Sequence, residues 1–341
     1  MSSTSRATLA HIADAAGVSL ATISKVLNGR TDVAPGTRKR VEELLTAHNY
    51  RKRAGGHSHA PLIELVFHEL HSTWSMEVIR GVQEAAEDYG LGVVLTKSGS
   101  RHSPGTEWLD GVIRRRPLAV VLVFSEVPPA MRETLAARST PFVVIDPAGD
   151  PEPDVPAVGS ANWAGGLAAV RHLIGLGHER IAAVSGPSDM MCSHARIDGY
   201  RAAMTAADLP IRDEWILYGD FTSEGGLTNG RKLLALQHTP TAIFAGSDLQ
   251  ALGVYDAARE RGLRVPEDLS VVGYDDIPLA QWVSPRMTTI NQPLAEMGRQ
   301  AVHIAVGLAK GEVQDTPRMD LATQLVVRES TTSPRAVTSP E

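Results

Sequence analysis

The sequence predicts a small all-α domain followed by an α/β body of two lobes, each built on a doubly wound parallel sheet. Two observations carry this prediction. Residues 1–53 contain short amphipathic helical patterns, whereas from Leu62 onward short apolar runs alternate with helical stretches over roughly 270 residues. Such alternation is typical of parallel sheets with helices on both faces. Its length exceeds that of one typical sheet, which favours two lobes.

The first expected helix lies close to the amino terminus. Apolar Leu9, Ile12, Ala13 and Ala16 recur with the spacing of one helical face. Gly17 follows directly and can adopt the positive φ that ends a helix.

Two further helices are expected before residue 50. Ser19 can cap the second by accepting a hydrogen bond from a backbone N–H two or three residues later. Pro35, a favoured first-turn residue, opens the third. Two helices joined by a tight glycine-containing turn and braced by a third form a helix-turn-helix. The side chains expected to face inward are Ile23, Val26 and Leu27 from the second helix and Val41, Leu44 and Leu45 from the third.

The charge of the chain is distributed unevenly. Residues 1–53 contain nine Lys and Arg against four Asp and Glu, a net charge of +5, while the remainder carries −11. A basic head on an acidic body indicates a polyanion bound at one end. A solvated basic terminal segment is the other reading of the charge alone.

The body follows a regular order of strands and helices. Expected strands are 62–67, 92–96, 118–124, 141–146, 180–186, 241–246 and 269–276, and expected helices are 76–90, 165–177, 195–208 and 250–262. In parallel sheets of this kind ligands bind beyond the carboxyl ends of the strands. The residues directly after the apolar runs are therefore the candidates for a binding site.

Two polar stretches mark boundaries. The stretch "RKRAGGHSHAP", Arg51 to Pro61, is typical of a linker, and the Pro-containing tail "TTSPRAVTSPE" is expected to be disordered. The expected boundaries are 1–53 for the helical head, 54–61 for the linker, 62–330 for the body and 331–341 for the tail.

The composition indicates a cytoplasmic protein. The single cysteine, Cys192, cannot form an intramolecular disulfide, so nothing indicates an oxidising compartment. The first residues, "MSSTSRATLA", lack the apolar core of a signal peptide, and no apolar run approaches ~20 residues. We expect no membrane association.

Several stretches together resemble the lactose/galactose repressor (LacI) family of bacterial regulators. They are "TLAHIADAAGVSLATISKVLNG", "TRKRVEELLTAHNY", "GLGHERIAAVSG", "RIDGYRAAM" and "SVVGYDDIPLAQWVSPRMTTINQP", in this order, so the resemblance runs from about Thr8 to Arg328. It implies a homodimer that binds a palindromic operator in double-stranded DNA, with half-sites about one helical turn apart. It also implies a small-molecule effector bound in the body.

The resemblance assigns DNA contacts to the second helix. Leu20, Ala21 and Lys25 stand at the family's base-contacting positions. Lys25 can donate to guanine O6 or N7, and the two apolar residues can contact a thymine methyl group. Positions that usually bind phosphate carry Ser19, Thr22, Ser24, Asn28 and Thr37. An ordinary packing helix would leave this outward face unexplained.

The linker departs from the family pattern. Relatives usually have a longer segment that forms a hinge helix with a leucine wedged into the minor groove. Here Gly55 and Gly56 disfavour a helix, and no leucine precedes Leu62. The hinge helix and its wedge are therefore not predicted from this sequence.

The body resembles periplasmic sugar-binding proteins, whose two lobes hold a ligand in the cleft. Sugar hydroxyls pair with Arg, Asp and Asn side chains, and the apolar face of a sugar ring packs on an aromatic ring. At the corresponding positions this chain has Arg196, Asp275, Phe221, Trp74 and Trp163, with His68, Ser247 and Gln292 as further candidates. Ser160 stands where many relatives have an aspartate.

Each pocket residue has an ordinary structural alternative. Asp275 could cap the following helix, and Arg196 could pair with Asp198 or Glu179 at the surface. The two tryptophans could pack between the lobes. Arg, Asp and several aromatic residues favour a mono- or disaccharide, which we expect to be the sugar of a catabolic operon in a repressor-type regulator. The alternative is a nucleobase corepressor held between Phe221 and Trp163.

Other classes of protein fit the sequence less well. It contains neither a G-x-x-x-x-G-K-[ST] phosphate loop nor a G-x-S-x-G elbow, and "HELH", His68 to His71, is one residue short of a zinc motif. Cys192 has His194 nearby but no orienting third group. We therefore expect no catalytic residue, metal ion or cofactor. A solute-binding protein without a DNA role would lack the basic helical head.

Overall fold

The computed structural model describes residues 9–27, 33–47, 59–68, 70, 73–99, 106–124, 126–312 and 317–335. The chain divides into two compact units, Met1–Ser58 and His59–Glu341. The linker expected at 54–61 ends earlier than predicted. His59 already donates from Nδ1 to the Pro117 carbonyl at 2.8 Å, and the first strand starts at Ala60.

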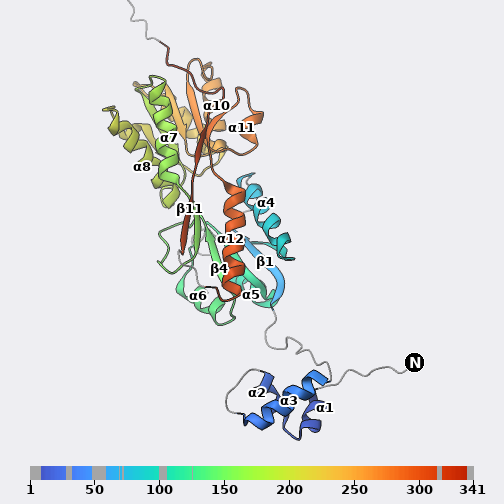
Figure 1. Ribbon diagram of the computed structural model, residues 1–341. Coiled ribbons are helices and arrows are strands. Elements are labelled where there is room, and N and C mark those ends of the chain that lie inside the picture. Colours follow the sequence, from blue (N-terminus) through green and yellow to red (C-terminus); the bar gives the residue numbers. More distant parts are fainter. Residues whose placement is uncertain are drawn as a thin grey trace, which may run out of the picture. The chain divides into compact units, whose positions relative to one another are not determined.

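The first unit contains the three expected helices, drawn in blue in Figure 1: α1 (Leu9–Ala16), α2 (Leu20–Leu27) and α3 (Pro35–Ala47). Gly17 has a φ of +66° directly after α1, and the Ser19 hydroxyl accepts a hydrogen bond from the Thr22 N–H at 3.2 Å. The turn and cap predictions are therefore confirmed. The buried core consists of Ile12, Ala13, Ala16, Ile23, Val26 and Val41, with Leu44 and Leu45 packed against it.

The second unit begins with an amino-terminal lobe whose six-stranded sheet has the order β11-β5-β4-β3-β1-β2. Its strands are β1 (Ala60–Phe67), β2 (Gly92–Lys97), β3 (Pro117–Val123), β4 (Phe142–Ile145), β5 (Ala157–Ser160) and β11 (Arg318–Leu321). Its helices are α4 (Thr73–Asp88), α5 (Thr106–Arg115), α6 (Pro129–Ala136) and α12 (Leu294–Ala309).

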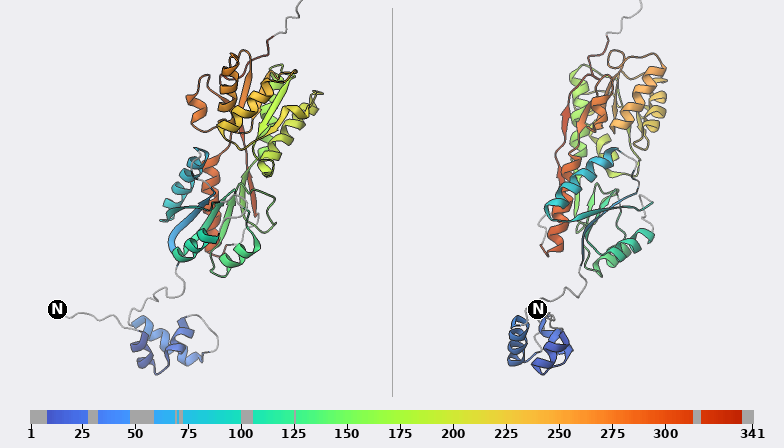
Figure 2. Two further views of the ribbon diagram at one scale, coloured as in Figure 1. Left: turned by 180° about the vertical axis from the view of Figure 1, so that it is seen from behind. Right: turned by 90° about the vertical axis from the view of Figure 1, so that its right-hand side faces the viewer.

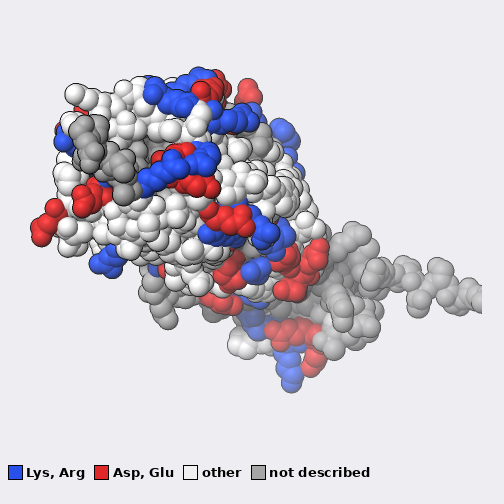
Figure 3. Space-filling view, turned by 90° about the horizontal axis from the view of Figure 1, so that it is seen from above, with Lys and Arg blue, Asp and Glu red and all other residues white. Residues whose placement is uncertain are grey.

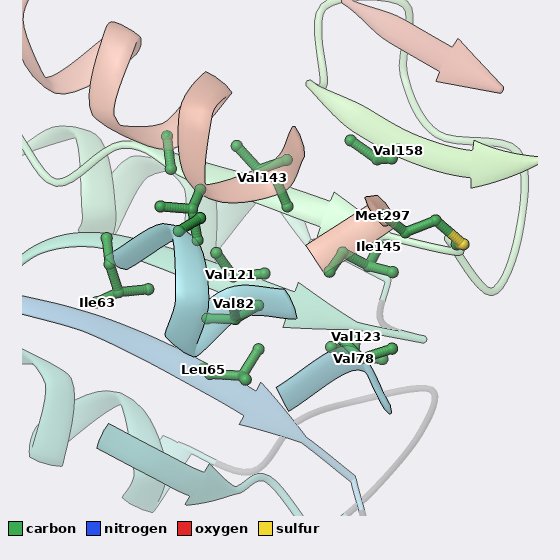
Figure 4. Close-up of a cluster of buried hydrophobic side chains, with 14 of the residues drawn as sticks. Ile63, Leu65, Val78, Val82, Val121, Val123, Val143, Ile145, Val158 and Met297 are labelled. Carbon is green, nitrogen blue, oxygen red and sulfur yellow. The ribbon is translucent and has the colours of Figure 1, made fainter. Parts of the chain in front are cut away.

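Helices cover both faces of this sheet. Val78 and Val82 of α4 and Met297 of α12 pack over Leu65 and Val121 on one face (Figure 4). On the other face, α5 and α6 contribute the side chains Trp108, Val112, Met131 and Leu135. The alternating apolar runs therefore form a three-layered lobe, as the sequence predicts.

The carboxy-terminal lobe repeats this design with the strand order β12-β10-β9-β8-β6-β7. Its strands are β6 (Ile181–Ser185), β7 (Ile216–Tyr218), β8 (Ala242–Ala245), β9 (Ser270–Asp275), β10 (Thr288–Asn291) and β12 (Gln324–Val326). Its helices are α7 (Asn162–Gly175), α8 (Met191–Ala206), α9 (Ser223–Leu234), α10 (Asp248–Glu260) and α11 (Leu279–Trp282), with a 3₁₀ turn at Asp213–Trp215. The short edge strand β12 runs antiparallel to β10, so the parallel sheets that we expected gain one antiparallel strand.

The chain passes between the two lobes three times. It crosses from β5 to α7, returns from β10 to α12, and crosses again from β11 to β12. Figure 2 shows the two lobes one above the other with these segments between them. Neither lobe is therefore one continuous stretch of sequence.

In both sheets the first strand of the lobe lies between its second and third strands, as β2-β1-β3 and β7-β6-β8. The chain reverses its winding direction at this point, and open α/β sheets bind ligands beside the carboxyl ends of such strands. The fold therefore places two such binding regions, one from each lobe, at the ends of β1, β3, β6 and β8.

The carboxy-terminal tail is ordered further than predicted. The Thr332 N–H donates to Ser270 Oγ at 3.0 Å, and the Thr332 carbonyl accepts from His178 Nε2 at 2.8 Å. Thr331 Oγ1 lies 2.9 Å from His172 Nε2. The prediction of disorder from Thr331 is thus wrong for residues 331–335, because polar side chains of the lobe bind this backbone. Residues 336–341 lie outside the described residues.

Candidate functional site

The outward face of α2 gathers most of the predicted DNA contacts. Ser19, Ala21 and Lys25 are exposed, and Leu20 is 54% exposed although it is a large apolar residue. Ile23 and Val26 of the same helix are buried. A helix with this division leaves one face available to a partner.

The remaining predicted DNA contacts are placed as follows. Thr22 is half-buried and its hydroxyl lies 3.0 Å from that of Ser19. Thr37 is half-buried in the first turn of α3. Ser24 lies within α2, but its side chain is outside the description, as is Asn28 as a whole. These contacts remain predictions.

A cavity of about 590 Å³ lies between the two lobes at the carboxyl ends of the strands. Such a volume is within the range of small-molecule sites. Its lining contains six of the eight predicted ligand-binding residues: His68, Trp74, Arg196, Phe221, Ser247 and Asp275.

A larger hollow of about 920 Å³ lies elsewhere on the amino-terminal lobe. Its lining includes Pro141, Phe142 and Pro156, at the amino-terminal ends of β4 and β5. Because ligands of open α/β sheets bind at the opposite, carboxyl ends, we regard the cavity between the lobes as the candidate site.

Aromatic rings reach the cavity from both lobes. Trp74 and Phe124 of the amino-terminal lobe stack with their centroids 4.6 Å apart and their planes at 29°. Phe221 lines the cavity from the carboxy-terminal lobe. Sequence reasoning missed Phe124 because it counted this residue as the last of the expected strand 118–124, whereas β3 ends at Val123 and Phe124 follows it.

Arg196, on α8, is 3% exposed and is held by the chain on several sides. Its Nε donates to Asn162 Oδ1 at 2.8 Å, Nη1 donates to the Gly246 carbonyl, and Nη2 donates to Gln292 Oε1 at 3.4 Å. Nη1 also lies 3.9 Å from Asp275 Oδ1. The guanidinium group is thus fixed at the cavity wall.

The alternative surface pairing of Arg196 with Asp198 is not formed. Asp198 instead pairs with Arg201 at 3.1 Å. The guanidinium carbon of Arg196 lies 3.7 Å from the ring centroid of Tyr274 and 5.4 Å from that of Phe221. Cation–π contact of this kind adds to the ion pair in holding the arginine.

Asp275 is also not a helix cap. Helix α11 begins after Pro278 without a side-chain cap, and the backbone N–H of Ile277 donates to Asp248 Oδ2 at 2.9 Å instead. Asp275 remains 6% exposed, beside Arg196, in the cavity lining. This geometry favours a ligand-binding role over the capping alternative.

Residues at the strand ends adopt unusual backbone conformations. The φ angles are +50° for Phe124, +48° for Asp146, +60° for Phe221 and +116° for Asp275. Side-chain-bearing residues rarely adopt positive φ, and such strain is concentrated at functional sites. Three of these four residues line the cavity.

Gln292 lies beneath the cavity rather than in its lining. Its Nε2 donates to Asp146 Oδ2 at 3.1 Å and to Ser160 Oγ at 3.0 Å, while its Oε1 accepts from Trp74 Nε1 at 3.3 Å. It is 2% exposed on the segment that crosses from β10 to α12. The predicted direct ligand contact is therefore replaced by a position that joins both lobes.

Trp163 does not line the cavity either. It is the second residue of α7 and is 48% exposed. Its place in the family pattern predicted a cleft wall, but the structure turns this side chain to solvent. The same exposure argues against the alternative that this side chain packs between the lobes.

Burial changes the acidity of the carboxyl groups around Arg196. It raises the pKa of Asp146 to about 6 and that of Asp275 to about 7, while the charge of Arg196 opposes both shifts. Burial also raises the pKa of Asp248 well above its usual value. The Arg196 guanidinium therefore lies near two buried carboxyl groups, Asp146 and Asp275, whose raised pKa values favour their protonated forms.

The remaining chemistry of the site is modest. Burial raises the pKa of the Cys192 thiol to about 12, so the sulfur stays protonated and is a poor nucleophile. Among the described residues, no three His, Cys, Asp or Glu side chains are grouped as metal ligands would be. No helix in the described part of the chain is long and apolar enough to span a bilayer.

The charged surface of the body is mixed in sign. Arg231 pairs with Glu260 at 2.6 Å and Arg264 with Asp268 at 3.1 Å. Figure 3 shows basic and acidic side chains next to one another on the face that it draws. Among the described residues on this face, basic side chains alternate with acidic ones and do not form a continuous basic stripe.

Comparison with known proteins matches both parts of the chain. Residues 8–52 match the model of bacterial regulatory proteins of the lacI family, and residues 170–331 match a periplasmic binding protein-like domain. The chain is 35% identical to the HTH-type transcriptional regulator CelR of Thermobifida fusca, over 95% of this chain and 98% of that protein.

Solved structures show the same likeness. A transcriptional regulator CelR–cellobiose complex is 34% identical, with a TM-score of 0.73 over 95% of this chain and 100% of that one. The lac repressor dimer bound to operator and the anti-inducer ONPF is 27% identical, with a TM-score of 0.69 over 96% of this chain and 100% of that one.

Proposed function

Because the chain belongs to the LacI family of bacterial regulatory proteins, we propose that it is a repressor-type regulator whose operator affinity is set by a small carbohydrate. Its relatives are DNA-binding transcriptional regulators and not enzymes. The family binds operator DNA as dimers, as in the lac repressor structure. We propose that this chain likewise binds a palindromic operator as a homodimer in the cytoplasm.

Sequence readout is assigned to the outward face of α2. Exposed Leu20, Ala21 and Lys25 would meet base edges in the major groove, while Ser19, Thr22, Ser24, Asn28 and Thr37 would hold phosphates. The exposure of Leu20 leaves its apolar side chain available for contact with a thymine methyl group.

The observation that carries the carbohydrate assignment is the composition of the cavity walls. Trp74, Phe124 and Phe221 supply apolar surfaces for sugar C–H faces, and Arg196 and Asp275 supply a donor and an acceptor for hydroxyls. Binding of cellobiose by the similar CelR supports the same class of effector. The nucleobase alternative loses support because Trp163, its second stacking ring, lies outside the cavity lining.

Effector binding would act through the segments that cross between the lobes. Gln292 bonds Asp146 and Ser160 of one lobe and Arg196 of the other. A ligand held by Arg196 and Trp74 therefore contacts two of the side chains bonded to Gln292. It shifts the equilibrium between two lobe arrangements only by its differential affinity for them, typically a coupling of ~1–3 kcal/mol.

A thermal-shift screen of the full chain against pentoses, hexoses, disaccharides, sugar phosphates and purines tests this proposal. A ligand at 100 times its Kd stabilises by ~2.7 kcal/mol, which raises the Tm by several degrees. A hit among sugars that also changes operator affinity supports the proposed effector class. A hit confined to purines overturns it in favour of the corepressor alternative.

A further inference from the structure

A second carboxylate, Asp220, lines the cavity near Phe221. Asp220 follows β7 and is exposed at the cavity, whereas Asp275 is buried in its wall. The lining of described residues thus holds two carboxylates against the guanidinium of Arg196. Asp275 already lies 3.9 Å from that guanidinium.

Asp220 occupies the amino terminus of α9. Its Oδ1 accepts from the Thr222 N–H at 3.1 Å and from the Thr222 hydroxyl at 2.7 Å. The Thr222 hydroxyl in turn accepts from the Gly225 N–H at 3.0 Å, as the cap of α9. A β-carbon added to Gly225 would lie 2.1 Å from Asp220 Oδ1, so the glycine makes room for this carboxylate.

This arrangement matters because a helix amino terminus is where proteins bind the anionic groups of ligands. Thr222 and Ser223, at the start of α9, line the cavity. Asp220 already supplies a negative charge there. A ligand phosphate or carboxylate at this end of the cavity would meet the like charge of Asp220.

The other helix ends at the cavity lead to the same result. Ser247 caps α10 by accepting from the Gln250 N–H at 3.1 Å, and Asp248 is the first residue of that helix. Helix α8 begins without a side-chain cap, but the N–H of its first residue, Met191, donates to the Ala148 carbonyl at 2.9 Å. Arg196, on this helix, lies 3.9 Å from Asp275 Oδ1 and donates to Asn162, the Gly246 carbonyl and Gln292, so the protein itself already engages much of the guanidinium group.

We infer that the cavity selects uncharged sugars over their phosphorylated or acidic counterparts, and that Asp220 is a residue that determines this selectivity. The inference rests on the proposed carbohydrate effector and specifies its chemical class. Selection against a partner by placing a like charge at its binding position is a known route to specificity.

Matched pairs of sugars test the inference on the full-length protein. Calorimetric titration compares glucose with glucose 6-phosphate, ribose with ribose 5-phosphate, galactose with galacturonate, and cellobiose with cellobionate. We expect the uncharged member of a bound pair to have a Kd at least tenfold lower than the anionic member. An anionic member that binds equally well or better overturns the charge selection and leaves the carbohydrate assignment intact. Absence of binding across all pairs overturns the carbohydrate assignment and the inference with it.

The role of Asp220 is tested by Asp220→Asn, which keeps the acceptor oxygen for Thr222 and removes the charge. We expect the ratio of the anionic to the neutral Kd to fall by roughly tenfold, equivalent to ~1.4 kcal/mol. Asp208→Asn removes one charge from an exposed turn after α8 and is expected to leave the ratio unchanged. Equal ratios in the two variants would exclude Asp220 as a selectivity residue.

Discussion

The ring of Phe221 lies directly against Gly186, so closely that a β-carbon on this glycine would be 2.1 Å from the ring Cζ atom. Gly186 follows β6 at the point where the winding of the carboxy-terminal sheet reverses. The Ser247 hydroxyl holds the same residue from the other side by donating to the Phe221 carbonyl at 3.2 Å. The aromatic wall of the cavity is thus positioned by a glycine and a helix cap.

Substitution of Gly186 is expected to move this wall. In Gly186→Ala the new methyl group must displace the Phe221 ring, since the two cannot occupy the same space. We expect the affinity for the sugar identified in the thermal-shift screen to fall by about tenfold, or ~1.4 kcal/mol, measured by calorimetry. Gly175→Ala is the control, because nothing lies within 4 Å of its added β-carbon. Unchanged affinity in Gly186→Ala would show that Phe221 does not contact the sugar.

Removal of the Lys25 side chain is expected to reduce sequence discrimination. Lys25→Ala should lose ~1–3 kcal/mol on an operator selected from random duplexes, because a base contact is removed. Fluorescence anisotropy on the selected and on a scrambled duplex measures the difference. Lys97→Ala, on β2 of the body, is the control and should bind both duplexes as the unmodified protein does. Equal losses of Lys25→Ala on both duplexes would assign Lys25 to phosphate.

Removal of Arg196 is expected to destabilise the fold. Arg196→Ala leaves buried Asp275 and Asp146 without their cation, and breaking a buried ion pair typically costs 3–5 kcal/mol. Urea unfolding measures this loss. Arg201→Ala removes an exposed arginine from the same helix and should change stability by less than about 1 kcal/mol. A similar small change for both variants would contradict the central position of Arg196.

The stability of the protein is expected to depend on pH through Asp275. Its pKa is raised from 3.8 to about 7 by burial, so the folded state keeps a proton that the unfolded chain releases. The contribution of this carboxyl to stability therefore falls as the pH rises from about 4 to about 7, by at most ~1.4 kcal/mol per pH unit.

The variant Asp275→Asn has no such proton to release. Its stability relative to the unmodified protein should increase between pH 5 and pH 8, as measured by urea unfolding at each pH. Asp208→Asn should follow the unmodified protein throughout. A difference between Asp275→Asn and the unmodified protein that stays constant over this range would show that Asp275 is ionised at both pH values.

The architecture could be predicted from the sequence because the signals that define helix ends and strands involve residues close together in the chain. Gly17, Ser19 and Pro35 act on their own neighbouring backbone, and each marks the expected helix boundary. A run of apolar residues likewise predicts a buried strand, whichever position that strand takes in the sheet. Arg196, Phe221 and Asp275 were identified from the resemblance to the family, because their motifs stand at its pocket positions.

The failures concern contacts between distant parts of the chain. Whether Trp163 faces the cavity depends on the rotation of α7, which its neighbours in sequence do not fix. Gln292 bonds Asp146 and Ser160, residues more than a hundred positions away, so its place beneath the cavity follows only from the crossing of the chain. Thr332 is ordered by His178 and Ser270, which a polar and Pro-containing tail does not reveal.

The three crossings also determine the order in which the protein can form during synthesis. The head, α1 to α3, is complete soon after it leaves the ribosome, and domains fold in the order of their emergence. The amino-terminal lobe cannot follow at once, because α12 and β11 supply part of its core and one edge of its sheet. Both lobes can therefore complete their sheets only after β11 and β12, the last strands, have been synthesised. Until then a folded helical head is attached to a body without an effector cavity. A messenger RNA truncated before β11 would therefore encode a protein that has the helical head but no completed cavity.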